Sequence, residues 1–395
     1  MTDYDNIDVT IVGGAGHVGL PLCLAFAEIG LRVLVLDINE QALKTIAEGK
    51  MPHLEFDAEP ALKRALDGNF LEFTSSATNI SPHSAIILTI GTPVDEFLNP
   101  IHDGVKSCID DLLPNIVDGQ LLILRSTIYP GTTDWLNDYL NKKGRKLELA
   151  FCPERVVQGH SMKELRSMPQ IVSGASASAE NSAAELFQML ASSIVRVNPK
   201  EAEFAKLFSN AYRYIEFAAA NQFYMIAQDA GVDFYKIHHA VTKDYPRMKN
   251  FPRAGFAAGP CLFKDTMQLA AFARNKFGLG HDAMLVNEGL VLHVIDEITG
   301  NEGLADKTVG LLGMAFKSEC DDIRSSLSYK LKKSLSLHTD NVLCTDPFVT
   351  TDPSLIPVEE VIEKSDILVL CTPHAAYKEL DFGSTPVYDM WGFYS

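Results

Sequence analysis

The chain has 395 residues, of which 47% are hydrophobic and 22% are charged, a composition typical of an ordered globular protein and unlike that of a disordered or fibrous one. Its length is enough for about two or three domains with buried cores. The formal net charge of −17 argues against a nucleic-acid partner, but an anionic ligand held by local backbone amides stays compatible with it.

Seven cysteines are scattered along the chain, and none forms a Cys-x-x-Cys or Cys-x-x-His pair of the kind that binds zinc. We therefore expect a reduced, cytoplasmic protein without a metal. Residues 1–5 are acidic and lack the basic segment that opens a secretory signal. The uncharged stretch 9–27 contains four glycines and Pro21, so a membrane-spanning helix is a poor interpretation and no membrane partner is expected.

The first predicted unit is a strand, a glycine-rich loop, a helix and a second strand. Residues 9–12 form the first strand, residues 20–29 form a helix closed by Gly30, and residues 31–36 form the second strand, which ends at Asp37. This βαβ pattern, with an acidic residue about 20 positions beyond the glycines, is typical of a dinucleotide-binding unit. The cofactor-binding candidates in its loop are Gly14, Gly16, His17, Val18 and Gly19.

The glycines and the acidic residue have separate physical roles in such a unit. Gly14 allows a tight turn, Gly16 lets the backbone approach a pyrophosphate, and Gly19 lets helix and strand pack closely. Asp37 would accept hydrogen bonds from the adenosine ribose and would repel a 2′-phosphate. We therefore expect NAD as the cofactor, in preference to NADP.

Further apolar runs at residues 85–90, 121–124, 147–151 and 194–197 predict buried strands of the same sheet, so the first domain should cover residues 1–198. Polar segments follow three of these strands. Because ligands of open α/β sheets bind outside the carboxyl ends of the strands, these segments are candidate pocket walls. They are Gly91-Thr92-Pro93, the segment from Ser126 to Thr133, and Cys152-Pro153-Glu154-Arg155.

Residues 201–230 contain no Gly or Pro and precede Gly231, which predicts one helix of about 45 Å. Such a helix is longer than one small domain requires, so we expect it to link domains and to contribute to a dimer interface. Lys206 and Asn210 are four residues apart and share a face of this helix. A cation and an amide side by side can donate hydrogen bonds to an oxyanion without offering a competing base. A central helical domain is expected at residues 199–301.

Residues 259–265 read Gly-Pro-Cys-Leu-Phe-Lys-Asp and place Cys261 in a polar setting beside Lys264 and Asp265, where a thiolate could be stabilised. A thiol nucleophile is useful when an aldehyde must be trapped and oxidised again. The combination with a dinucleotide loop therefore hints at a four-electron oxidation of an alcohol to an acid. Beyond it, apolar runs in residues 302–395 predict a second α/β domain.

Taken together, these segments resemble the UDP-glucose/GDP-mannose dehydrogenase family, whose members are nucleotide-sugar 6-dehydrogenases, and the resemblance runs nearly end to end. It implies an α/β fold with two Rossmann-like doubly wound domains joined by a long central helix and a helical middle domain. It also implies NAD, a nucleotide-sugar substrate and a homodimer. The matching segments are the glycine loop, 91–95, 126–127, 130–133, 153–154, Lys206 with Asn210, 259–265, 316–317 and 321–324.

The resemblance also implies residue roles. Cys261 would attack the C6 aldehyde to give a thiohemiacetal, whose oxidation yields a thioester that water hydrolyses. Lys206 and Asn210 would stabilise the oxyanions. The remaining catalytic candidates, Asp265, Thr127 and Glu154, would position or deprotonate the water, and the base stays open among Asp265, Lys206 and Glu154.

Binding roles follow from the same resemblance. The C-terminal domain would bind the nucleotide sugar. Further cofactor-binding candidates are Thr92, Thr127 and Arg324. The substrate-binding candidates are Glu154, Lys206, Asn210, Phe256, Gly259, Phe316 and Lys317.

The identity of the sugar stays open. Pro153-Glu154-Arg155-Val156 resembles the branch that acts on UDP-N-acetylhexosamines, and Gln158 stands where the UDP-glucose branch often has a carboxylate. Lys264-Asp265 instead resembles the UDP-glucose and GDP-mannose branches. A UDP-hexose, a UDP-N-acetylhexosamine and GDP-mannose are therefore all candidate substrates.

Two other classes of function compete with this interpretation. A two-electron β-hydroxyacid dehydrogenase shares the first domain and the Lys/Asn pair, but it needs neither the Cys261 loop nor a third domain. A non-catalytic sensor of NAD or of a nucleotide sugar would keep the fold alone. The presence of Cys261 with Lys206, Asn210 and Asp265 favours the enzyme, which would make a uronic acid for a polysaccharide or glycan.

Overall fold

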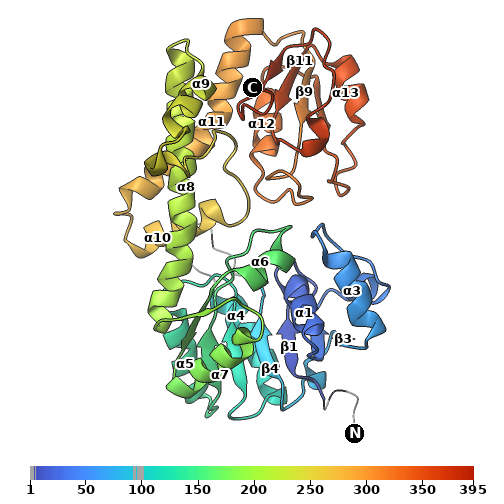
Figure 1. Cartoon of the computed structure of the whole chain (residues 1–395), viewed down its shortest axis with the longest axis vertical. Helices are drawn as coiled ribbons and strands as arrows, with labels where there is room; N and C mark the ends of the chain where they lie inside the picture. Colours follow the sequence, from blue (N-terminus) through green and yellow to red (C-terminus); the bar gives the residue numbers. More distant parts are fainter. Residues whose placement is uncertain (1–3, 5, 92–94, 96–101) are drawn as a thin grey trace. The chain divides into compact units, whose positions relative to one another are not determined.

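The computed structural model describes residues 4, 6–91, 95 and 102–395 (Figure 1). The chain divides into two compact units, residues 1–208 and 209–395. The predicted division into domains at residues 1–198, 199–301 and 302–395 stays a prediction. Among the described residues, no helix is both long enough and apolar enough to span a membrane. The predicted cytoplasmic location also stays a prediction.

The first unit is built on an eight-stranded sheet in the order β3-β2-β1-β4-β5-β6-β7-β8. Neighbouring strands are parallel except β6 and β7, which pair antiparallel. The strands are β1 Val9–Val12, β2 Val33–Leu36, β3 Leu71–Thr74, β4 Ala85–Leu88, β5 Leu121–Leu124, β6 Glu148–Phe151, β7 Gln170–Gly174 and β8 Ile194–Arg196.

Helices cover both faces of this sheet. Side chains of α1, α2, α3, α6 and α7 pack in one core cluster and those of α4 and α5 in another. Alternate residues of β1 enter the two clusters, Val9 and Ile11 the first and Val12 the second. The sheet is therefore doubly wound, as predicted. The helices are α1 Gly19–Glu28, α2 Glu40–Ala47, α3 Ala58–Asp67, α4 His102–Leu112, α5 Thr132–Lys142, α6 Ser161–Ser167 and α7 Ala177–Gln188.

The second unit carries a smaller parallel sheet in the order β10-β9-β11-β12, with α11 and α12 packed on one face and α13 on the other. Its strands are β9 Val309–Leu312, β10 Val342–Thr345, β11 Ile367–Leu370 and β12 Val387–Tyr388. Its other helices are α9 Phe234–Thr242, α10 Leu262–Phe272, α11 Gly278–Glu302, α12 Leu327–Leu335 and α13 Val358–Lys364. The predicted long helix is confirmed as α8, Pro199–Asp229, which begins in the first unit and continues into the second.

The two sheets share a local geometry where their first strands end. Gly13 follows β1 with φ +81°, and Gly313 follows β9 with φ +94°. A Cβ atom at Gly13 would meet Thr89, which follows β4, and one at Gly313 would meet Thr372, which follows β11. In both units a glycine with positive φ therefore packs against a threonine from the strand beside it.

A carboxylate completes the same geometry in each unit. Asp37, directly after β2, accepts a hydrogen bond from the amide of Ala15 at 3.0 Å. Asp346, directly after β10, accepts hydrogen bonds from the amides of Met314 at 2.7 Å and Ala315 at 2.9 Å. The second unit thus repeats the turn and the carboxylate of a dinucleotide-binding loop without its run of glycines.

Helices α8 and α11 are joined by a buried amide network in the second unit. The side chain of Asn221 donates to the carbonyl of Gly255 at 3.0 Å and to Asn287 Oδ1 at 2.9 Å, and it accepts from the Gly255 amide at 2.8 Å. Asn287 in turn donates to the carbonyl of Tyr214 at 3.0 Å. Both asparagines are fully buried, so each of these bonds replaces one that water would otherwise make.

We predict that Asn221→Ala lowers the free energy of unfolding by about 2–4 kcal/mol, because it leaves several buried polar groups without partners. Chemical denaturation measures this loss. Gln222→Ala, an exposed position one residue along α8, is the matched control and should change the stability little. Equal effects of the two substitutions would contradict the proposed importance of the network.

Candidate functional site

The glycine loop after β1 leaves backbone exposed on one side and is tightly packed on the other. A Cβ at Gly14 would lie 2.8 Å from Val35 Cγ1, and one at Gly19 would lie 2.2 Å from the carbonyl oxygen of Gly13. At Gly16 the nearest atom would be 3.4 Å away. Gly19 therefore has the close-packing role predicted for it, and Gly16 has the open side that a pyrophosphate needs. The left-handed turn itself lies at Gly13, so Gly14 serves close packing against β2 in place of the predicted turn.

The N-terminus of α1 is suited to an anion. Val18 is its N-cap residue, no side chain caps the helix, and its first turn contains no acidic residue. Amides at such an end attract a phosphate through their hydrogen bonds and through the helix dipole. Asp37 lies beside this loop and is partly exposed, where a carboxylate can accept from ribose hydroxyls. These residues fit a bound NAD.

His17 is fixed by contacts from outside the glycine loop. Its Nδ1 lies 2.9 Å from Nε2 of Gln158, and its ring lies 4.1 Å from the ring of His53. Since an amide nitrogen can only donate, His17 Nδ1 is the acceptor of this bond. Gln158, which departs from the UDP-glucose branch, therefore lies beside the dinucleotide loop. Thr92 lies outside the described residues.

Glu154 is held in an ion pair with a fully buried arginine. Arg125, directly after β5, donates to Glu154 Oε2 and also to the carbonyl of Cys152 and to Gln170. Glu154 Oε1 accepts from the amides of Arg155 at 2.7 Å and of Val156 at 2.9 Å. Both oxygens of Glu154 are thus engaged. Thr127, two residues after Arg125, is partly buried in the segment that leads to α5.

The start of α8 is fixed to the start of α5 by another buried carboxylate. Glu203 accepts from the amide of Gly131 at 2.5 Å and from the amide and hydroxyl of Thr133 at 2.8 and 2.7 Å. Burial raises the pKa of Glu203, while these hydrogen bonds act in the opposite direction. Lys206 lies three residues further along α8 and is half-buried. The anchored carboxylate therefore fixes the turn of helix that carries Lys206.

Cys261 differs from the other cysteines, all of which the structure describes. Its side chain is exposed, whereas the other six are buried or partly buried. Burial raises the pKa of the other thiols, to about 11 in Cys108, Cys320 and Cys344, to about 12 in Cys152, and further in Cys23 and Cys371. A raised pKa keeps a thiol protonated and unreactive. Cys261 is therefore the most accessible of the seven cysteines and the candidate nucleophile among them.

The surroundings of Cys261 also suit a thiolate. Cys261 is the N-cap residue of α10, and the N-terminus of a helix stabilises negative charge. One turn further, the fully buried Asp265 accepts from Asn210 Nδ2 at 2.6 Å through Oδ2. Its Oδ1 lies 3.5 Å from Lys264 Nζ and makes no hydrogen bond among the residues that the structure describes. The structure thus brings Cys261, Asp265 and Asn210 together.

Arg324 lies near this cysteine. It makes a bidentate contact with Asp322, whose Oδ2 is 2.6 Å from Arg324 Nη2 and 3.0 Å from its Nε. The pKa of Arg324 is raised chiefly by the hydrogen bond to Asp322, with smaller contributions from the thiols of Cys261 and Cys320. The amide of Gly259 also donates to the carbonyl of Ser325 at 3.3 Å, which ties the two segments together. The segment that carries Arg324 therefore lies beside the one that carries Cys261.

Two predicted substrate residues contact each other, and a third is buried. A Cβ at Gly259, whose φ is +102°, would lie 2.6 Å from the ring of Phe316, so only glycine fits there. Lys317 follows and is partly exposed. Phe256 is 4% exposed and packs in the core of the second unit, which leaves its side chain little access to a ligand.

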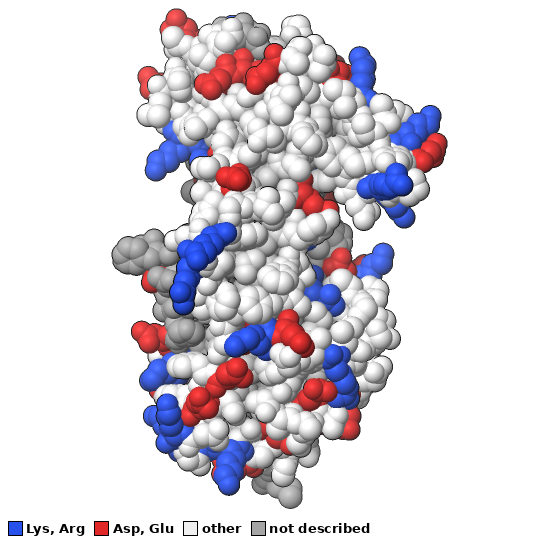
Figure 2. Space-filling view, turned by 90° about the vertical axis from the view of Figure 1, so that its left-hand side faces the viewer, with Lys and Arg blue, Asp and Glu red and all other residues white. Residues whose placement is uncertain are grey.

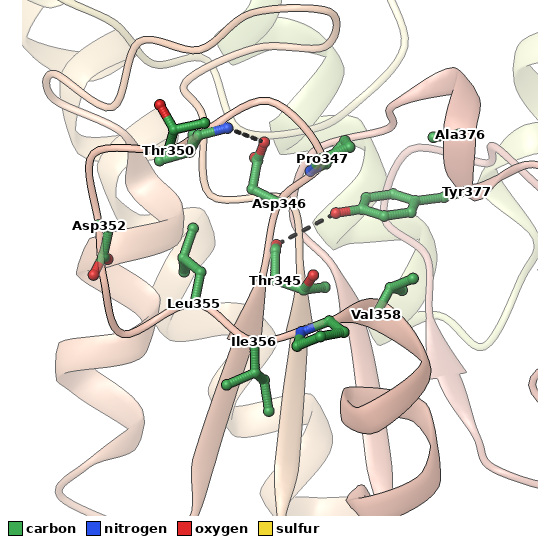
Figure 3. Close-up of a pocket in the computed structure, with 12 residues that line it drawn as sticks. Thr345, Asp346, Pro347, Thr350, Asp352, Leu355, Ile356, Val358, Ala376 and Tyr377 are labelled. Atoms are coloured by element: carbon green, nitrogen blue, oxygen red, sulfur yellow. Dashed lines mark hydrogen bonds between the residues drawn. The ribbon is translucent and has the colours of Figure 1, made fainter.

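A pocket of about 490 Å³ lies at the carboxyl end of β10 (Figure 3). Its wall is largely apolar and includes Leu355, Ile356 and Val358, with Asp346 and Tyr377 at its border. The predicted substrate residues Phe256, Gly259, Phe316 and Lys317 do not line it. Cys261, Asn210 and Asp265 do not line the pocket either, so it is separate from the site around Cys261.

Charges are mixed over the surface. On the face drawn in Figure 2, Lys and Arg alternate with Asp and Glu, and the described residues form no continuous basic patch there. A nucleic-acid-binding face would gather its cations.

Comparison with known proteins agrees with this geometry. The chain matches the NAD binding domain of the UDP-glucose/GDP-mannose dehydrogenase family over residues 7–191, its central domain over residues 200–288 and its UDP binding domain over residues 310–394. Together with the dinucleotide loop, these matches define an NAD-binding oxidoreductase. The chain belongs to the UDP-glucose/GDP-mannose dehydrogenase family, as its sequence predicts.

Individual relatives are similar over nearly the whole chain. The UDP-N-acetyl-D-mannosamine dehydrogenase of Pyrococcus horikoshii is 29% identical over 389 residues, which cover 94% of this chain and 90% of that protein. The NDP-N-acetyl-D-galactosaminuronic acid dehydrogenase of Ralstonia nicotianae is 25% identical over 400 residues, with 96% and 93% covered. The solved structure of the Pyrococcus horikoshii UDP-D-ManNAc dehydrogenase has a TM-score of 0.89 at 27% identity, and covers 98% of this chain and 96% of that one.

The partners of several site residues are not predicted from the sequence. Arg125 and Glu203 were not singled out, although each fixes a segment that carries a candidate residue. A signal for Arg125 was available, because it directly follows a buried strand and Glu154 follows the neighbouring one. A buried arginine needs a carboxylate, and parallel strands end at the same edge of a sheet.

We predict that Gly16→Ala weakens NAD binding, whereas Gly19→Ala lowers the stability of the fold. Gly16→Ala should keep its stability and weaken NAD binding by about tenfold or more, because its Cβ projects into the open side of the loop. Gly19→Ala should lose about 2 kcal/mol or more of stability, because its Cβ overlaps backbone. Thermal denaturation and NAD titration measure the two effects. Equal loss of stability in both variants, or unchanged NAD binding in Gly16→Ala, would contradict this assignment.

Proposed function

We propose that the protein catalyses the NAD-dependent four-electron oxidation of the C6 hydroxymethyl group of a nucleotide sugar to the uronic acid. The observation that carries the proposal is Cys261, an exposed thiol at the N-terminus of α10, one turn from the Asn210–Asp265 pair. A two-electron alcohol dehydrogenase has no use for such a thiol, and a sensor has no use for the buried carboxylate beside it. Both alternatives are therefore less well supported.

The residues have separate tasks in this reaction. NAD, when bound, accepts one hydride in each of two oxidations. Cys261 adds to the C6 aldehyde and holds it as a thiohemiacetal, so that the second oxidation leaves a thioester on sulfur. Hydrolysis of the thioester by water releases the carboxylate and returns the thiol. Lys206 and Asn210 would donate hydrogen bonds to the oxyanions formed at C6.

We propose Asp265 as the group that receives a proton from the attacking water. Its Oδ1 makes no hydrogen bond among the described residues, whereas both oxygens of Glu154 accept hydrogen bonds already. Asp265 also lies four residues from Cys261 on the same helix. Glu154 and Thr127 would then position the water, with Arg125 fixing Glu154.

We propose a UDP-N-acetylhexosamine as the substrate. Relatives over nearly the whole chain are named as dehydrogenases of UDP-N-acetyl-D-mannosamine and of NDP-N-acetyl-D-galactosaminuronic acid, and the segment Pro153 to Val156 resembles the branch that acts on UDP-N-acetylhexosamines. The match to the family's UDP binding domain supports a nucleotide sugar as the substrate. UDP-glucose and GDP-mannose are the alternatives.

We predict that the wild-type protein forms two NADH per molecule of one UDP-N-acetylhexosamine and releases a carboxylate. Cys261→Ala should lose acid formation by at least about a thousandfold while NAD binding stays unchanged, because the loop after β1 is untouched. NADH absorbance and product mass measure both. Cys108→Ala, at a partly buried cysteine, is the matched control and should stay active. One NADH per sugar, or acid formation by Cys261→Ala, would refute the covalent mechanism.

We further propose that the protein is a homodimer formed through α8 and α11. Tyr212, Phe223 and Ile226 are exposed and lie 11 and 14 positions apart on one side of α8, and Leu285 and Leu292 are exposed on α11. In Figure 2, which shows the side of Figure 1 where α8 lies, the second unit has a broad area with few charged side chains. Exposed apolar area of this kind favours association.

Phe223→Glu should therefore shift the protein from dimer toward monomer. Light scattering coupled to size exclusion gives the mass of each variant. Gln222→Glu is the control, because residue 222 points about 100° away around the helix and receives the same charge. A wild-type protein with the mass of one chain would show that this surface has another role.

A further inference from the structure

The loop between β9 and α12 carries Phe316 and Lys317, and it is fixed at its start by Asp346. Asp346 Oδ2 accepts from the amides of Met314 and Ala315, and Oδ1 accepts from the amides of Phe348 at 2.8 Å and Val349 at 3.1 Å. Burial alone would raise the pKa of Asp346, but the hydrogen bond from His374 and those from backbone amides hold it below its ordinary value. Figure 3 shows this carboxylate at the border of the pocket.

The middle of the same loop is held by His374. This side chain is fully buried after β11, between the rings of Phe348 and Tyr377, whose centroids lie 5.2 and 5.6 Å away. Its Nδ1 lies 3.1 Å from the amide nitrogen of Glu319, and its Nε2 lies 3.1 Å from Asp346 Oδ2. An amide can only donate, so Nδ1 is the acceptor, and the proton on Nε2 is donated to Asp346.

Glu319 adds a second contact to the same segment. Its Oε1 accepts from the amide of Ala375 at 2.8 Å, and its backbone has a φ of +51°, which is unusual for a residue with a side chain. Such a conformation persists when its surroundings hold it. His374 and Ala375 supply those surroundings from the neighbouring strand end.

We infer that His374 is a positioning residue for substrate binding: it bridges Asp346 to Glu319, and the bond that it accepts from the Glu319 amide fixes the end of the segment 314–319, which presents Phe316 and Lys317. This inference rests on the proposed function, in which these two residues contact the nucleotide sugar. A loop that is already ordered loses little conformational entropy when a ligand binds, so the affinity is higher than for a mobile one. These bonds hold residues 314–319, and the cofactor-binding candidate Arg324 lies beyond that segment, so we expect the larger effect on the nucleotide sugar.

His374→Asn and His374→Gln separate the two halves of the bridge. The amide oxygen of Asn lies near the place of Nδ1 and can accept from Glu319, whereas the amide nitrogen of Gln lies near the place of Nε2 and can donate only to Asp346. We expect KM for the nucleotide sugar to rise about tenfold in His374→Gln and to stay within about threefold in His374→Asn. KM for NAD should change less than KM for the sugar in both variants.

Hydrogen exchange of residues 313–320, followed by mass spectrometry, gives a readout besides activity. Exchange should be faster in His374→Gln and close to wild type in His374→Asn. Glu319→Ala removes the contact with Ala375, leaves His374 in place, and should raise KM for the sugar less than His374→Gln. Glu319→Ala tests the same segment of the loop if a His374 variant does not fold.

Equal KM values for the sugar and equal exchange in the two His374 variants would overturn the inference. So would lower melting temperatures in both variants with KM for the sugar at the wild-type value, since His374 would then serve stability alone. If the wild-type protein oxidises no nucleotide sugar, the proposed function fails by itself. In that case exchange and the calorimetric Kd of UDP decide whether His374 fixes the loop and aids nucleotide binding.

Discussion

A carboxylate placed directly after the second strand of a parallel sheet organises both units of this protein. In the first unit Asp37 accepts from the loop after β1, and in the second Asp346 accepts from the loop after β9. The two carboxylates differ in their capacity to accept further hydrogen bonds from a ligand. Asp37 is partly exposed and can still accept from a ribose, whereas Asp346 is surrounded by four amides and His374, with no exposed surface on its side chain. The same interaction thus supports a ligand site in one unit and a rigid loop in the other.

The loops that these carboxylates hold have diverged at the positions where glycine matters. Counting from the glycine with positive φ, Gly16 in the first unit corresponds to Phe316 in the second. A side chain of that size would cover the backbone that a pyrophosphate must approach. In place of a dinucleotide-binding loop, the second unit therefore has a loop with an aromatic ring and a lysine. The absence of a side chain at Gly259 leaves room for that ring.

Much of this fold could be predicted from sequence because its strands are apolar and its turns contain glycine. The strands β4, β5 and β6 follow from apolar runs, and the long helix α8 follows from the absence of Gly and Pro over residues 201–230. The strands β3 and β7 were missed, since Leu-Glu-Phe-Thr and Gln-Ile-Val-Ser-Gly contain polar residues and lack a long apolar run. The partners of site residues were harder to foresee. The ion pair of Arg125 with Glu154 and the bond of His374 to Glu319 join positions 29 and 55 residues apart, which only the strand order brings together.

The uneven burial of the seven thiols has a consequence for oxidative damage. Peroxide and similar oxidants react with accessible thiolates, and the first product, a sulfenic acid, is reversible with thiol reductants. Five cysteines are buried, Cys108 is partly buried, and only Cys261 is exposed among the seven, all of which lie in the described residues. Oxidation of Cys261 would therefore stop the proposed reaction while the cores stay intact, and a reducing environment would restore the thiol without refolding.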